Sequence, residues 1–112
     1  MDGRELLRAH IDSFNDAVRS GDFSVMLERF APDAELSFEG LPVGPFAGKA
    51  AIARAYEQQP PDDTIELLDV AGDDPVVGRY SWSRDEGAQS GRMLLYERDG
   101  LIERLVVTFE RE

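Results

Sequence analysis

The chain has 112 residues, which fits one domain with one core, and 42% of them are hydrophobic, which argues against a disordered chain. Its 12 basic and 23 acidic residues give a formal net charge of −11, which argues against binding to nucleic acid or to an anionic membrane surface. The absence of Cys and the presence of a single His, His10, exclude disulfides and zinc sites built from Cys or from His pairs, and we expect neither a metal nor a cofactor.

The first predicted element is an amphipathic helix. Leu7, Ile11, Phe14 and Val18 recur at helical spacing and form one apolar stripe, and Gly21 is expected to end the helix in a left-handed conformation. His10 lies one residue from this stripe, so we interpret it as a residue of the helix surface, with an acid–base role as the alternative.

A second helix and a strand are expected next. Asp22 is predicted to cap the helix, which buries residues up to Phe30 and stops at Pro32. Alternating apolar and polar residues over 34–39 then predict a strand. A loop rich in Gly and Pro follows over 40–45.

A third helix and a strand meander complete the predicted order. The helix begins at Gly48 and ends at Pro60. Four strands are expected after it, at residues 65–71, 76–84, 90–98 and 101–110. The pair Asp99-Gly100 between the last two strands is typical of a two-residue hairpin turn.

The order ααβαββββ predicts a single α+β domain over residues 1–112, with helices on one face of the sheet. Residues 1–8 are charged and lack the apolar segment of a signal peptide. No apolar run approaches the length of a membrane span, so the expected location is the cytoplasm, without membrane contact.

Three strings, at residues 14–22, 30–38 and 48–56, resemble the nuclear transport factor 2-like superfamily, and within it the SnoaL-like proteins. That group includes ketosteroid isomerases, polyketide cyclases and limonene epoxide hydrolase. The resemblance implies a cystatin-like cone, in which three helices pack on a curved, mainly antiparallel sheet around a pocket. It also implies a homodimer that forms through the sheet.

Ketosteroid isomerase chemistry is not expected, because its site positions carry the wrong side chains. By resemblance, the Tyr donor of the first helix falls on Phe14, the Asp base of the first strand on Phe38, and the acidic donor of the penultimate strand on Arg92. A supporting Tyr falls on Phe30, and only the supporting Tyr of the third helix is kept, as Tyr56. Phe can neither donate a hydrogen bond nor take up a proton.

The resemblance also implies which residues face the pocket. The expected pocket residues are Phe14, Val18, Phe30, Leu36, Phe38, Tyr56, Tyr80, Trp82, Arg92, Leu94, Leu105 and Phe109. Arg92 could anchor a carboxylate, phosphate or enolate oxygen, and the alternative is an Arg that reaches the cone mouth or pairs with a local acid. Catalytic residues remain unknown. Glu39 and Tyr56 join Arg92 as weak candidates, with a solvated Glu and a packed Tyr as their alternatives.

Three functions remain open from the sequence. The chain could be a cofactor-free isomerase, cyclase or hydrolase that acts on a small apolar or aromatic molecule bound in the cone. The same pocket could instead bind such a ligand without catalysis. The domain could also be a dimeric interaction module whose own aromatic side chains fill the cavity.

Overall fold

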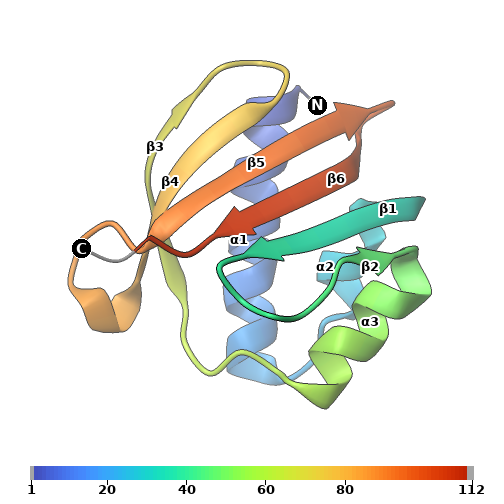
Figure 1. Ribbon diagram of the computed structural model, residues 1–112, viewed down its shortest axis with the longest axis horizontal. Helices are drawn as coiled ribbons and strands as arrows, with labels where there is room; N and C mark the ends of the chain where they lie inside the picture. The colour runs from blue at the N-terminus through green and yellow to red at the C-terminus, as the bar shows by residue number, and fades with distance from the viewer. Residues whose placement is uncertain (1, 111–112) are drawn as a thin grey trace.

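The computed structural model describes residues 2–110 and has three helices beside one six-stranded sheet (Figure 1). The elements in chain order are α1 (Gly3–Ser20), α2 (Ser24–Glu28), β1 (Phe30–Glu39), β2 (Phe46–Ala47), α3 (Lys49–Gln58), β3 (Ile65–Ala71), β4 (Val76–Trp82), the 3-10 turn η1 (Ser83–Asp85), β5 (Gly91–Arg98) and β6 (Leu101–Thr108). The strand order is β2-β1-β6-β5-β4-β3. Only the β1–β6 pair among these strands is parallel, so the α+β prediction with a mainly antiparallel sheet is confirmed.

Helix α1 forms as the sequence predicts, because both of its ends are capped. The Asp2 side chain accepts a hydrogen bond from the Glu5 backbone N–H at the start. Gly21 adopts a left-handed φ of 82° at the end and donates its N–H to the Ala17 carbonyl. Between these caps, one face of the helix is buried against the sheet.

The second helix is shorter than expected. It ends at Glu28, and Phe30 and Pro32 belong to β1, so the prediction that Pro32 stops the helix is wrong. The reason is pairing across the sheet: Phe30 lies opposite Ile102, whose N–H donates to the Arg29 carbonyl. Pro32 fits in the strand because the register shifts between residues 30 and 35, where no regular ladder bond is required of it.

The short strand β2 was not expected. Phe46 and Ala47 pair with Leu36 and Glu35 of β1, directly after the Gly/Pro-rich loop. A two-residue strand leaves no alternation for a sequence pattern to detect.

The C-terminal meander follows the prediction closely. β3 has the expected bounds, whereas β4 ends at Trp82 because the next three residues form η1. β6 ends at Thr108 rather than at residue 110. Asp99 and Gly100 have φ values of 54° and 81°, as a two-residue hairpin turn with two left-handed residues requires.

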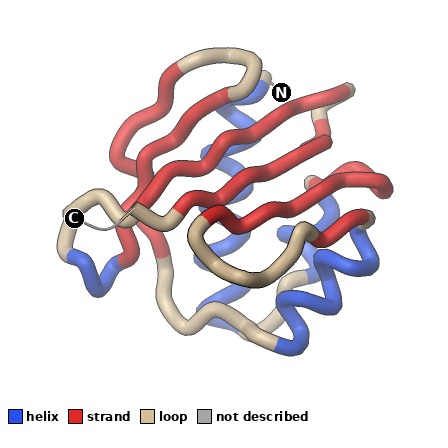
Figure 2. The backbone as a smooth tube through the Cα atoms, viewed as in Figure 1, coloured by secondary structure: helices blue, strands red, loops and turns tan. Residues whose placement is uncertain are grey.

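The helices divide the sheet between them. α1 contacts β3, β4 and β5, while α3 contacts β1 and β2 (Figure 2). The core beneath α1 includes Leu95, Leu105 and Tyr80, all fully buried. No helix within residues 2–110 is long and apolar enough to cross a membrane.

Candidate ligand-binding cavity

A cavity of about 490 Å³ lies between the helix-covered face of the sheet and the helices α1 and α3. Aromatic and aliphatic side chains dominate its wall. The lining residues are His10, Phe14, Phe38, Leu41, Val43, Gly44, Phe46, Ala55, Tyr56, Gln58, Gln59, Pro61, Tyr80, Trp82, Met93, Leu105, Val107 and Phe109.

Most of the residues expected at the pocket lie around this cavity. Those that line it are Phe14, Phe38, Tyr56, Tyr80, Trp82, Leu105 and Phe109. Phe30 and Leu36 are instead fully buried in the core, and Val18 packs against that core. Leu94 is on the opposite face of the sheet from Met93 and Leu95, which are buried.

The prediction that Arg92 faces the pocket is wrong. Arg92 lies opposite Arg79 in the β4–β5 ladder, while Tyr80 lies opposite Gly91. Because residues directly opposite each other share a face, Tyr80 faces inward with Gly91 and Met93, and Arg92 faces outward. The inward-facing residue opposite Tyr80 is Gly91, which has no side chain. The sequence pattern therefore could not show which residues of β5 face inward.

Arg92 forms an ion pair on the outer face. Its Nε lies 2.9 Å from Glu110 Oε2. This bond, aided by the Thr108 hydroxyl, lowers the pKa of Glu110 below its ordinary value. Glu39 is an exposed strand-end residue and does not line the cavity either. Of the three catalytic candidates, only Tyr56 is at the cavity wall.

His10 lies at the cavity, contrary to its interpretation as a surface residue. Its side chain is 1% exposed, and its Nδ1 has no hydrogen-bond partner. The ring meets Phe30 edge to face, with 5.5 Å between centroids. Burial, and secondarily the charge of Arg29, lower the pKa of His10 from 6.5 to about 4, so the imidazole is neutral at pH 7. The missed signal was the spacing, since His10 is three residues after Leu7 and four before Phe14.

The two tyrosines of the cavity wall are also uncharged. Tyr80 donates its hydroxyl to the Thr108 carbonyl at 2.8 Å. Tyr56 stacks on Phe23 with 5.1 Å between ring centroids. Burial is the main cause that raises the pKa of both hydroxyls above the ordinary value. Neither group is therefore an anion near pH 7.

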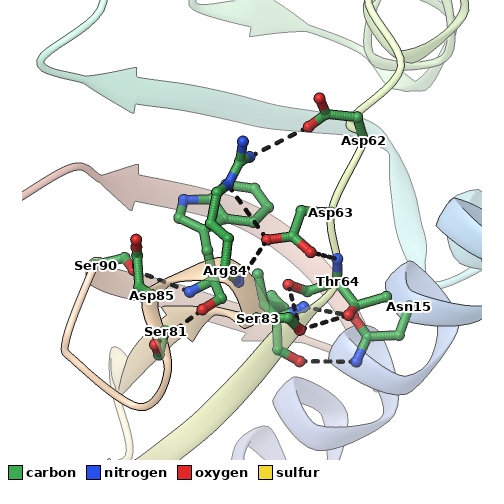
Figure 3. A network of polar contacts seen from close by, with 11 residues as sticks. Asn15, Asp62, Asp63, Thr64, Ser81, Ser83, Arg84, Asp85 and Ser90 are labelled. Carbon is green, nitrogen blue, oxygen red and sulfur yellow. Dashed lines mark hydrogen bonds and ion pairs between the residues drawn. The ribbon is translucent and has the colours of Figure 1, made fainter.

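A polar network holds the Trp82 side of the cavity in place (Figure 3). The Arg84 guanidinium lies 5.4 Å from the centre of the Trp82 ring. Arg84 is paired with Asp62 at 3.2 Å and with Asp63 at 3.3 Å, in the segment that precedes β3. These contacts join η1 to the segment that carries Pro61, so two walls of the cavity are fastened together.

Apolar and amide side chains form the exposed part of the wall. Leu41 and Val43, in the loop after β1, are 46% and 40% exposed. Gln58 and Gln59, at the end of α3, are exposed as well. The lining therefore passes from His10, which is almost fully buried, to these residues at the solvent side.

The geometry agrees with what comparisons with known proteins find. A family profile described as SnoaL-like domain matches residues 11–105. The chain belongs to the SnoaL-like domain family. Among curated proteins, none matches this sequence significantly.

Solved structures extend this result. A protein from Sphaerobacter thermophilus is 26% identical, with a TM-score of 0.72 and coverage of 100% of this chain and 99% of that one. A Sinorhizobium meliloti protein that carries the provisional name polyketide cyclase is 26% identical, with a TM-score of 0.63 and coverage of 88% and 93%. A cystatin-like protein of unknown function from Methylobium petroleophilum, 18% identical, covers 100% and 80% with a TM-score of 0.72. The cystatin-like fold predicted from the sequence is thus confirmed.

The arrangement is suited to enclosing an apolar body, with few groups able to exchange a proton. Among the described residues, no cluster of three or more His, Asp or Glu side chains is placed to hold a metal ion. The polar side chains among the lining residues are those of His10, two tyrosines, two glutamines and Trp82. One of these, the Tyr80 hydroxyl, is already bonded to the backbone.

Proposed function

We propose that this SnoaL-like protein binds a small, largely apolar molecule with aromatic or fused rings in its cavity. The observation that supports this proposal most directly is the cavity itself, which remains open at about 490 Å³ although many aromatic side chains line it. Ligand sites of proteins have volumes of a few hundred to about a thousand Å³ and mostly apolar walls. Aromatic rings in such a wall favour a ligand that offers faces and edges of its own.

The proposal is one of binding, without ketosteroid isomerase chemistry. By the resemblance to ketosteroid isomerases, Phe14 and Phe38 fall on the positions of a donor and a base, and both line the cavity. Neither can exchange a proton. Arg92, at the third position, is on the other face of the sheet. The provisional name of the S. meliloti relative, polyketide cyclase, favours a ring-bearing ligand here too.

Two methionines provide a direct test. Met93 lines the cavity, whereas Met26 is fully buried in the core outside it. With the methionine methyl groups labelled with ¹³C, a fused-ring compound such as 2-methylnaphthalene or 2-naphthol should shift the Met93 signal through its ring current. The chemical shift of the Met26 methyl group should not change on addition of the compound, so Met26 serves as the internal reference.

A pair of substitutions on α3 shows whether the cavity is the site. Ala55 lines the cavity, and Ala50 is exposed on the same helix. Ala55→Phe should fill the space and abolish the Met93 shift, while Ala50→Phe should leave the titration unchanged. If neither a naphthalene, an anthraquinone nor a four-ring steroid moves Met93, ligand binding in this cavity is disproved.

A further inference from the structure

No ionised side chain of the described residues lines the cavity, although the chain has 35 charged residues, 12 basic and 23 acidic. Within residues 2–110, His10 is the one basic side chain of this wall, and it is neutral at pH 7. A charged ligand would lose its hydration on entry and find no counter-ion, which is strongly unfavourable. The wall therefore selects for uncharged molecules.

Two arginines close in sequence to the cavity wall already have ionic partners. Arg84 lies over Trp82 and is paired with Asp62 and Asp63, and Arg92 is paired with Glu110 on the outer face. The net charge of −11 also repels anions at long range. An anionic ligand is thus disfavoured both during approach and after entry.

His10 provides a hydrogen-bonding group at the buried part of the wall. His10 lines the cavity although only 1% of its surface is exposed, and its Nδ1 is enclosed by protein atoms and has no hydrogen-bond partner. Because Nδ1 is closed off, Nε2 is the ring nitrogen left to contact a ligand in the cavity, and a polar group of the ligand would give it a hydrogen bond.

A neutral imidazole has one nitrogen that donates and one that accepts. A hydroxyl group can bond Nε2 in either tautomer, since it is both donor and acceptor, whereas a carbonyl or an ether could bond it only when Nε2 carries the proton. The other polar hydroxyl of the inner wall, that of Tyr80, is committed to the Thr108 carbonyl.

From these observations we infer that the ligand is an uncharged ring compound with a hydroxyl group that hydrogen-bonds to His10, while its rings lie against the aromatic wall. This inference rests on the proposed function, because it specifies the ligand class of the same cavity. It assigns His10 a role in binding and requires no proton transfer.

Three naphthalenes of similar size separate the inference from the proposed function. At pH 7 we expect 2-naphthol to bind more tightly than 2-methylnaphthalene by about three- to tenfold, as one hydrogen bond allows. The anion 2-naphthoate should bind most weakly. Dissociation constants would come from the Met93 methyl shift, so that every compound is measured at the cavity.

Substitution of His10 tests the named contact. His10→Phe should weaken 2-naphthol binding by about three- to tenfold and change 2-methylnaphthalene binding less than twofold. Ser13→Ala is the matched control, because Ser13 is a buried polar residue of the same helix that bonds Arg29 and does not line the cavity. It should leave both constants unchanged.

The native protein provides a readout that does not depend on any variant. His10 is the only His, so ¹⁵N labelling of histidine gives one pair of imidazole signals in tag-free protein. 2-Naphthol should shift one of these nitrogens, and 2-methylnaphthalene should shift them less. If both compounds bind equally while His10 stays silent, the ligand-binding proposal stands and the hydroxyl inference is overturned.

Two other results would also overturn it. Tightest binding by 2-naphthoate would show that a cation, such as Arg84, contributes to the site. Loss of the 2-naphthol preference in Tyr56→Phe instead of His10→Phe would transfer the contact to the tyrosine. If none of the three naphthalenes moves Met93, and the anthraquinone and the steroid do not move it either, the proposed function fails first, and the inference fails with it.

Discussion

Burial of His10 has a consequence for stability that pH reveals. Its pKa is lowered to about 4 in the fold, mainly by burial, while the unfolded chain keeps the ordinary value of 6.5. As the pH falls from 6.5 toward 4, the unfolded chain takes up this proton and the folded chain does not, so stability falls over that window. Between pH 7 and pH 5 we expect His10 to reduce the free energy of unfolding by roughly 2 kcal/mol.

Comparison with His10→Phe isolates this effect from the titration of the many carboxylates. Urea unfolding at pH 7 and at pH 5, followed by the fluorescence of Trp82, gives the decrease in the free energy of unfolding for each protein. The variant should lose roughly 2 kcal/mol less than the native protein. Equal losses would mean that the folded protein can protonate His10, and the ¹⁵N titration of this single His would then have its midpoint near 6.5 instead of 4.

At the scale of elements, one side chain joins α1 to the start of β3. Asn15 donates to the Ile65 carbonyl and accepts from the Ile65 N–H, both at 2.8 Å (Figure 3). Asn15→Ala should destabilise the protein by about 2 kcal/mol, since two partly buried hydrogen bonds are lost. Asn15→Asp keeps the acceptor but turns an oxygen toward the carbonyl, so we expect at least as large a loss in urea unfolding. A native-like midpoint for the Asp variant would show that Ile65 does not need this contact.

Two strand glycines differ in what a methyl group would meet. A Cβ on Gly91 would lie 1.9 Å from the Thr108 carbonyl oxygen, whereas one on Gly78 would meet the ends of the Leu7 and Leu67 side chains at 2.7 and 2.9 Å. Backbone cannot move as side-chain ends can. Gly91→Ala should therefore destabilise by about 3 kcal/mol or more, and Gly78→Ala by about 1 kcal/mol. Urea midpoints that rank the two variants in the opposite order would contradict this account.

The elements also show what the sequence could and could not predict. The helix α1 and the strand β3 were predicted because their caps and patterns are local. The end of α2 was not, since pairing of Phe30 with Ile102, 72 residues apart by their numbers, decides it. The inward face of β5 was not predicted either, because Gly91 offers no side chain at the position opposite Tyr80. The accuracy of the prediction was therefore limited by strand register between distant parts of the chain, and not by local propensity.

Prediction of the candidate site likewise succeeded where the signal was a local pattern and failed where it depended on packing. The aromatic residues of the wall could be predicted, because apolar side chains alternate visibly along their strands. His10 was missed, since a polar residue at stripe spacing looks like a surface residue until the helix is packed. Arg92 was placed wrongly by a shift of one residue, which moves a side chain from one face of a sheet to the other.

At the scale of the whole molecule, the charge of −11 opposes folding through self-repulsion. The ion pairs do little to offset this, because pairs such as Arg19–Asp16 and Arg98–Asp33 are largely exposed, and exposed pairs contribute little. Salt screens both effects. Since the repulsion involves every acidic residue, we expect NaCl between about 10 and 300 mM to raise the melting temperature by several degrees.

The choice of salt separates screening from specific ion effects. Choline chloride at the same ionic strength should raise the melting temperature as much as NaCl does, because screening depends on ionic strength alone at these concentrations. A non-ionic solute of equal osmolarity should have a smaller effect. A melting temperature that falls with either salt would show that the surface ion pairs, including the Arg84 network beside Trp82, stabilise the fold more than the excess of acidic residues opposes it.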